Sequence, residues 1–386
     1  MVNTQSNTGH LHLWNRNFWL MVIANLLLSV SVTMLIPTLP QWLLLSEGLT
    51  SAETGCVMGI FAVGLYLPGV FCSYLVQHYR RNLVCVWSVL ALAVTIVLPS
   101  FVNLKGALLL ITVIRLIQGM AFGLAQMVLA STLVIDTCDS VRRTEANHSA
   151  TWFGRFALSV GPLAGILVYK WAGFEWVSWV SAVCCLVTVL LILSVHFPFR
   201  VPTDSVHLFS LDRFILTSGW PLMAILFLFT FSVGLLLSLP LDEHFYGLLM
   251  IGFLLALLAQ RFVFPNAELK SEIVSGMILV GASILIRLTS PSSILFSPLL
   301  GFGMGVVGAR ILLFFVKLSH HCQRGTSQST FILGWESGLA MGIGAGFYLF
   351  ADDPKSMLYT ALCIIVLTLA CYVMVIHKWL MVHKNR

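Results

Sequence analysis

The sequence contains few charged residues and no polar segment long enough to form a soluble domain. Asp, Glu, Lys and Arg make up 9% of its 386 residues, whereas hydrophobic residues make up 59%. Soluble globular domains carry about 25% charged residues, so this scarcity excludes a protein whose main solvent is water. Lys and Arg outnumber Asp and Glu by 21 to 15, but they are spread over short separate loops, which does not indicate nucleic-acid binding.

Motifs for catalysis and for cofactor binding are also missing. The sequence has no Gly-x-x-x-x-Gly-Lys phosphate loop, which leaves an ATP-driven pump unsupported. No predicted helix gathers a nucleophile, a base and metal ligands, and the nine cysteines lack metal-ligand spacing and are typical of free thiols. We therefore expect neither an enzyme nor a bound metal or cofactor.

Long apolar runs dominate the chain. Most have roughly 18 to 25 residues, the length that crosses about 30 Å of hydrocarbon as a helix, and backbone groups in lipid must bond within their own segment. We predict an all-α membrane protein with twelve transmembrane helices, near residues 18–40, 55–76, 83–101, 106–134, 149–171, 176–197, 217–239, 245–264, 273–292, 294–317, 328–350 and 357–377.

Basic residues mark one side of the membrane. With the N-terminus inside, fourteen of the 21 Lys and Arg residues fall in cytoplasmic segments, four fall within spans, and only Lys105, Lys170 and Lys355 fall in outer loops. Cytoplasmic loops are enriched in Lys and Arg. Both termini are therefore predicted to be cytoplasmic.

The chain repeats itself at a shift of 181 residues. This shift aligns Arg143 with Arg324, Arg155 with Glu336, Gly161 with Gly342 and Gly165 with Gly346. The repeat predicts two six-helix halves, residues 1–197 and 217–386, joined by a cytoplasmic linker at 198–216. Two such bundles could rock about a site near the middle of the bilayer.

Two helix motifs carry a resemblance to a known family. The fourth span contains Arg115-Leu-Ile-Gln118-Gly119, and the fifth contains Gly161-Pro162-Leu-Ala-Gly165, which bends this helix or brings it close to a neighbour. With these motifs the chain resembles the major facilitator superfamily over essentially its whole length. The resemblance implies a secondary transporter that works by alternating access, and its first span is similar to those of bacterial drug and sugar exporters.

The loop between spans two and three departs from the family pattern. The resemblance places a glycine, an aspartate and basic residues there, where this sequence has Ser73, Gln77, Arg80 and Arg81. In the family that aspartate helps to close the cytoplasmic side. We expect a cytoplasmic gate made of Gln77, Arg80, Arg81 and Asp136, with Asp136 as the partner of Arg81.

Five charged residues are predicted inside spans, where each costs about 2.5 to 3.5 kcal/mol. They are Arg115, Arg155, Arg287, Arg310 and Glu336. Arg115 shares one helix stripe with Gln118 and Gln126, and the resemblance implies that this stripe faces the central cavity. The alternative is that Arg115 pairs with Asn25 of the first span and only holds helices together.

Glu336 is the acid predicted deepest in the membrane. Desolvation disfavours its charged form, so it could bind and release a proton, unless it forms a fixed pair with an arginine. Arg155, with Trp152 on the same face, is its counterpart in the repeat. Arg310 could line the cavity or reach the interface, and Arg287 is expected to be an interfacial anchor.

These observations lead to one main hypothesis and two alternatives. We expect a proton-coupled exporter, an antiporter in the bacterial inner membrane, whose partners are the lipid bilayer, protons and a small anionic or zwitterionic solute, and which acts as a monomer. The cavity would be lined by Asn25, Arg115, Gln118, Gln126, Trp152, Arg155, Arg310 and Glu336. The alternatives are an uptake symporter for a small organic acid, sugar or peptide, and a non-transporting receptor on the same scaffold.

Overall fold

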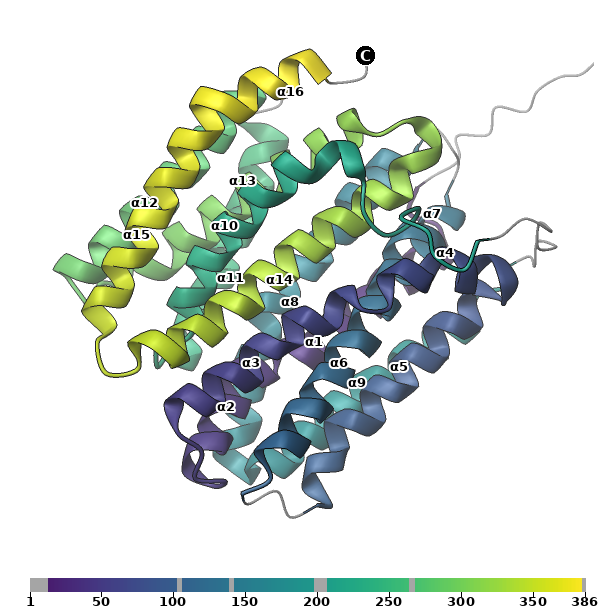
Figure 1. The fold of residues 1–386 in the computed structure, drawn as a ribbon. Coiled ribbons are helices and arrows are strands. Elements are labelled where there is room, and N and C mark those ends of the chain that lie inside the picture. The colour runs from purple at the N-terminus through teal and green to yellow at the C-terminus, as the bar shows by residue number, and fades with distance from the viewer. Residues whose placement is uncertain (1–12, 103–105, 139–141, 198–206, 264–267, 384–386) are drawn as a thin grey trace, which may run out of the picture.

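The computed structural model describes residues 13–102, 106–138, 142–197, 207–263 and 268–383, and this part of the chain is helical (Figure 1). The helices of the first half are α1 Arg16–Thr33, α2 Leu35–Leu45, α3 Ser51–Tyr66, α4 Gly69–His78, α5 Arg81–Val97, α6 Leu108–Val128, the π-helix η2 Leu129–Leu133, α7 Val134–Asp136, α8 Arg143–Ala172 and α9 Phe174–Leu193. Those of the second half are α10 Trp220–Leu237, α11 Glu243–Phe262, α12 Leu269–Thr289, α13 Phe296–Leu318, α14 Arg324–Phe350, α15 Pro354–Cys371, the π-helix η6 Tyr372–Ile376 and α16 His377–His383.

Ten helices of the described chain are long and apolar enough to cross a membrane. The pair α3 and α4, bent by 45°, raises the number to eleven if it forms one span. Helix α14 is the remaining predicted span. It has 27 residues but is rich in Gly, Ser and Thr and carries Glu336, so its composition is less apolar. The predicted all-helical membrane fold is confirmed.

The helices gather in two groups along the chain. In Figure 1 the purple and blue helices lie together below and to the right, and the green and yellow helices lie above and to the left. Helix α1 packs against α8 and α9, and α10 packs in the same way against α14 and α15. Contacts between the groups run mainly along α3 with α14 and along α8 with α11. The division at residues 198–216 stays a prediction, and residues 198–206 of this linker lie outside the described part.

Glycines allow the closest helix contacts in both groups. A Cβ atom added to Gly165 of α8 would lie 2.6 Å from the Met34 carbonyl oxygen, and one added to Gly342 of α14 would lie 2.2 Å from the Phe231 carbonyl oxygen. Helix α8 continues unbroken through Pro162. The Gly161-Pro162-Gly165 motif therefore brings α8 against the first span, and the repeat counterpart of Gly161 makes the equivalent contact in the second group.

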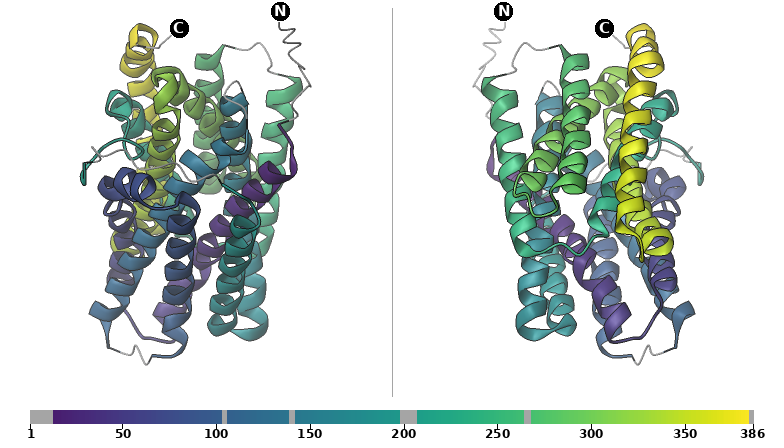
Figure 2. Two further views of the ribbon diagram at one scale, coloured as in Figure 1. Left: turned by 90° about the vertical axis from the view of Figure 1, so that its right-hand side faces the viewer. Right: turned by 90° about the vertical axis from the view of Figure 1, so that its left-hand side faces the viewer.

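The helices run side by side along the length of the molecule, which gives it two ends (Figure 2). We call the end that carries Arg81 and Asp136 the inner end, because it is the one predicted to face the cytoplasm. We call the end that carries Lys170 and Glu243 the outer end. Helix α8 reaches from one to the other, because it begins at Arg143 and ends at Ala172.

Candidate functional site

A small polar cavity lies between α1, α6, α8 and α14. The volume open to the centre of a water molecule is about 40 Å³, which is room for a few water molecules or a small solute. It contains four of the residues predicted to line a cavity, from both halves of the chain. Its lining consists of Asn25, Ser29, Gln126, Thr151, Gly154, Arg155, Gln328, Phe331, Ile332, Trp335 and Glu336.

Arg155 is the most unusual residue of this lining. Its side chain is buried, with the residue 2% exposed, and none of its three side-chain nitrogens has a hydrogen-bond partner among the described residues. Its guanidinium carbon lies 4.8 Å from the ring centroid of Trp152 and 5.8 Å from that of Trp335. The rings attract the cation, but they do not replace the hydrogen bonds that a buried guanidinium loses on leaving water. The guanidinium of Arg155 is therefore a buried cation with no hydrogen-bond acceptor among the described residues.

Glu336 faces the same cavity from α14. Its side chain is half-buried, and no ion pair within 4.0 Å joins it to Arg155 or to another residue of the described chain. The two repeat counterparts, Arg155 and Glu336, thus line one cavity without a direct ion pair between them.

Three amide side chains connect the walls of the cavity. Asn25 of α1 donates to the Ala150 carbonyl of α8 at 3.0 Å, and Gln126 of α6 donates to the Ser29 hydroxyl of α1 at 2.9 Å. Gln328 of α14 donates to the Thr151 hydroxyl of α8 at 2.8 Å. This last bond links a helix of the first half to a helix of the second at the cavity.

Arg115 and Gln118 lie outside this cavity. Arg115 donates to the Gln118 side-chain oxygen at 2.9 Å, and Gln118 donates to the Thr95 carbonyl of α5 at 2.9 Å. The guanidinium carbon lies 4.4 Å from the Phe61 ring centroid of α3. Arg115 and Gln118 line a separate, smaller cavity together with Trp42. The structure therefore brings Arg115 to contacts between helices, neither to Asn25 nor to the cavity of Arg155.

Arg310 also lies outside the cavity lining. It pairs with Glu272 of α12, with 2.6 Å between the Arg310 Nε and Glu272 Oε2 atoms. The Glu272 side chain is 4% exposed. Sequence reasoning missed this acid because it lies in the first turn of α12, where a charged residue is expected to reach water. The sequence did hold one signal for Glu272, because an arginine predicted inside a span, such as Arg310, needs an acidic partner.

Other lining residues were missed because they are uncharged. Gln328, Ile332, Trp335 and Glu336 are spaced by four, three and one residues, so they share one face of α14. Gln328 is eight residues before Glu336 on that face. A search for polar residues in register with the intramembrane acid would have found it.

At the inner end, Arg81 forms the expected ion pair with Asp136, and Gln77 donates to the Ser73 hydroxyl at 3.0 Å. Arg80 is exposed beside them. The role of these residues as a gate stays a prediction.

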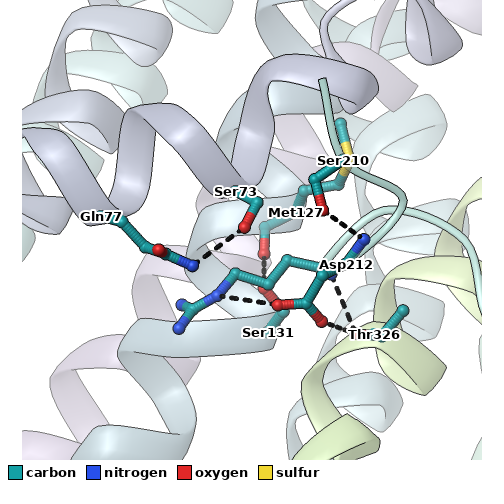
Figure 3. Close-up of polar contacts among 8 residues, drawn as sticks. Ser73, Gln77, Met127, Ser131, Ser210, Asp212 and Thr326 are labelled. Atoms are coloured by element: carbon teal, nitrogen blue, oxygen red, sulfur yellow. Dashed lines mark hydrogen bonds and ion pairs between the residues drawn. The ribbon is translucent and has the colours of Figure 1, made fainter. Parts of the chain in front are cut away.

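The end of the linker crosses the same region (Figure 3). The Thr326 hydroxyl of α14 donates to an Asp212 carboxylate oxygen at 3.1 Å and accepts from the Arg213 backbone N–H at 2.9 Å. The Ser210 backbone N–H donates to the Val70 carbonyl of α4 at 3.0 Å. Residues 210–213 therefore join a helix of the first half to a helix of the second at the inner end.

The outer end is hollow. A vestibule bordered by α2, α8, α11 and α14 has a volume of about 630 Å³ that is open to the centres of water molecules. Lys170 of α8 and Glu243 of α11 lie on its border and form an ion pair at 2.6 Å. The two ends thus differ, because the linker crosses the inner one whereas the outer one has a wide vestibule.

Long apolar helices that enclose a cavity lined with ionisable and amide side chains define a multi-pass membrane protein. The family model of the Major Facilitator Superfamily matches residues 21–345, and the chain belongs to this family. The resemblance noted in the sequence is thereby confirmed. None of the curated proteins matches the chain.

Solved structures of transporters share the fold at low sequence identity. The human organic anion transporter MFSD10 (TETRAN) is 17% identical with a TM-score of 0.66, over 92% of this chain and 98% of that one. The POT family transporter PepTSo is 12% identical with a TM-score of 0.72, over 97% and 100%. The nucleoside transporter NupG is 14% identical with a TM-score of 0.64, over 92% and 99%.

Proposed function

We propose that this protein is a proton-coupled secondary transporter of a small anionic or zwitterionic solute, and that with a zwitterion it works as an antiporter in the efflux direction. The observation that carries the proposal is the buried Arg155, which has no hydrogen-bond partner among the described residues and shares its cavity with Glu336. The fold likeness to three transporters, one of them named for organic anions, supports solute transport.

Arg155 is proposed to bind the negative group of the solute. A carboxylate in the cavity would accept charge-assisted hydrogen bonds from the guanidinium, and these are stronger than bonds between neutral groups. The aromatic rings of Trp152 and Trp335 lie against the guanidinium and form an apolar surrounding, which strengthens the attraction. An organic cation would instead meet the buried positive charge and be repelled.

Glu336 is proposed to carry the coupled proton. Antiport requires that the solute and the proton exclude each other at one site. A zwitterion meets this condition if its carboxylate binds Arg155 and its ammonium binds Glu336, because the ammonium and the proton then compete for one carboxylate. Binding of solute on one side releases the proton, and rebinding of a proton on the other side completes the cycle.

A solute that has only negative charge would couple in the opposite sense. A proton on Glu336 removes a negative charge close to the anion, so the proton and the anion bind together and the carrier runs as a symporter. This uptake mode for a small organic acid is the second candidate function. The same pair of charges, Arg155 and Glu336, supports it when the solute has no ammonium group.

Flux into proteoliposomes of known orientation tests the proposal. The purified protein is reconstituted, a pH gradient is imposed, and uptake of labelled carboxylates and amino acids is followed together with proton movement. Antiport predicts that proton and solute move in opposite directions, and symport predicts the same direction. The variant Glu336→Gln should lose the response to the gradient, whereas Glu175→Gln, at an exposed position of α9, should keep it. Flux that does not depend on the pH gradient and is unchanged in the Glu336→Gln variant would contradict the proton role of Glu336. The absence of flux for every solute tested would favour a receptor.

A further inference from the structure

Two buried amide oxygens in the cavity lack hydrogen-bond partners among the described residues. They are the Oδ1 atom of Asn25 and the Oε1 atom of Gln328, which belong to residues that are 5% and 1% exposed. Buried polar atoms in folded proteins are nearly always hydrogen-bonded. Both residues line the cavity of Arg155 and Glu336, so a ligand in this cavity is the natural source of the missing donors.

The orientation of each amide is fixed by its other contact. The nitrogen of Asn25 faces the Ala150 carbonyl at 3.0 Å, and a carbonyl can only accept, so Oδ1 must be the free atom. The Thr151 hydroxyl already donates to the Asn147 carbonyl at 2.7 Å. It can therefore only accept from Gln328 at 2.8 Å, which again leaves the oxygen free. Exchanging the nitrogen and oxygen of Asn25 would oppose two acceptors, and exchanging those of Gln328 would require the Thr151 hydroxyl to give up its bond to the Asn147 carbonyl.

The cavity thus presents two kinds of groups to a ligand. It offers the unpaired N–H donors of Arg155, and it offers acceptors on Asn25, Gln328 and Glu336. A primary ammonium carries three N–H donors, a hydroxyl carries one, and a methyl group carries none. Of these groups the ammonium supplies the most donors to the acceptors, and its positive charge is opposite to that of a Glu336 carboxylate.

We infer that the solute is a small amino acid zwitterion, whose carboxylate binds Arg155 and whose primary ammonium is held by the acceptors of the cavity, which are on Asn25, Gln328 and Glu336. The inference rests on the proposed function and narrows its solute class. The cavity is small, with about 40 Å³ open to the centres of water molecules, so it selects an amino acid with a short side chain. An ammonium at Glu336 is also the arrangement that gives antiport.

Equilibrium binding to the purified full chain in detergent tests the inference, with alanine, lactate and propionate as probes. The three compounds share a three-carbon carboxylate and differ only in the ammonium, hydroxyl or hydrogen on the second carbon. We expect alanine to bind at least tenfold more tightly than propionate, with lactate between them. Glycine and N,N,N-trimethylglycine add a second comparison, because they have the same charges but only glycine has N–H donors. Glycine should bind at least tenfold more tightly.

Variants assign the selectivity to the two amides. Gln328→Met and Asn25→Leu remove an acceptor while keeping similar size, so each should reduce the preference for alanine over propionate several-fold. Gln260→Met is the matched control. Gln260 has an Oε1 atom that is also buried without a partner among the described residues, but it does not line this cavity. Its variant should keep the wild-type preference, and the thermal unfolding midpoint of each variant shows whether it folds.

The outcomes separate this inference from the function on which it rests. Equal binding of alanine and propionate, or a preference that survives in both cavity variants, would overturn the ammonium assignment while leaving a carboxylate site at Arg155. Tighter binding of lactate than of alanine would also overturn it, in favour of a hydroxy acid. If none of these carboxylates binds, the proposed function fails together with the inference.

Discussion

The ion pair between Arg310 and Glu272 predicts a large and specific effect on stability. The Glu272 side chain is buried at 4% exposure, the Arg310 side chain is partly buried at 15%, and the Glu272 Oε1 atom has no partner among the described residues. Arg310→Met would leave a buried carboxylate without its cation, which costs about 3 to 5 kcal/mol. Glu272→Leu would leave the arginine alone, with a cost of the same order. Replacing both should cost much less than the sum, because apolar residues of similar size often substitute well for a buried pair.

The double-mutant cycle can be measured by denaturant titration in mixed micelles. We expect a coupling free energy of about 3 kcal/mol or more between the two positions. Arg261→Met, an exposed position in the last turn of α11, is the control and should change the free energy of unfolding by less than about 0.5 kcal/mol. Solute flux that is reduced in the single variants should be restored in the double variant, because the pair stabilises the packing of α12 against α13. Additive free energies would refute the pairing, and a stable double variant without flux would show that Arg310 acts on the solute itself.

Two further predictions concern helix packing and the inner end. Gly165→Ala places a methyl group 2.6 Å from the Met34 carbonyl oxygen and should lower the free energy of unfolding by about 1 to 3 kcal/mol. Gly247→Ala, where a Cβ atom would have no neighbour within 4 Å, should raise it by up to about 1 kcal/mol, and equal effects of the two changes would argue against the close approach of α8. Asp136→Asn weakens the ion pair with Arg81, and loss of this pair should lower the stability of the inner end by about 1 kcal/mol. Hydrogen exchange of residues 129–137 should then become about fivefold faster, and unchanged exchange would show that this pair does not hold the inner end closed.

The membrane fold could be predicted from sequence because the signal is local. Apolar length is set by the thickness of the bilayer, so each span is encoded in its own residues. The first span, predicted at 18–40, begins at Arg16 and continues through α2 to Leu45. The eleventh, predicted at 328–350, begins at Arg324. Errors of this size arise because helices extend beyond the hydrocarbon core, where capping and loop contacts decide their ends.

The site was only partly predictable because it depends on how helices are rotated about their axes. Arg155 and Glu336 share a cavity, as equivalent positions of a repeat can do. Arg115 is as costly a residue, yet its helix turns it toward Gln118 and Phe61. That choice is made by packing against α3 and α5, and no local pattern within α6 encodes it. The acceptors of Asn25 and Gln328 become visible only when their donated bonds are known.

The central claim is that Arg155 binds the carboxylate of the solute in the cavity next to Glu336. It is tested most directly by the affinity of the tightest-binding carboxylate, measured as the ligand-dependent rise of the thermal unfolding midpoint. Loss of a hydrogen-bonded charge costs about 1.5 to 3 kcal/mol, so Arg155→Gln should weaken binding roughly tenfold to a hundredfold. Arg287→Gln, in the last turn of α12 where Arg287 donates to the Pro291 carbonyl, should bind like the wild type. Wild-type affinity in a folded Arg155→Gln variant would contradict the account.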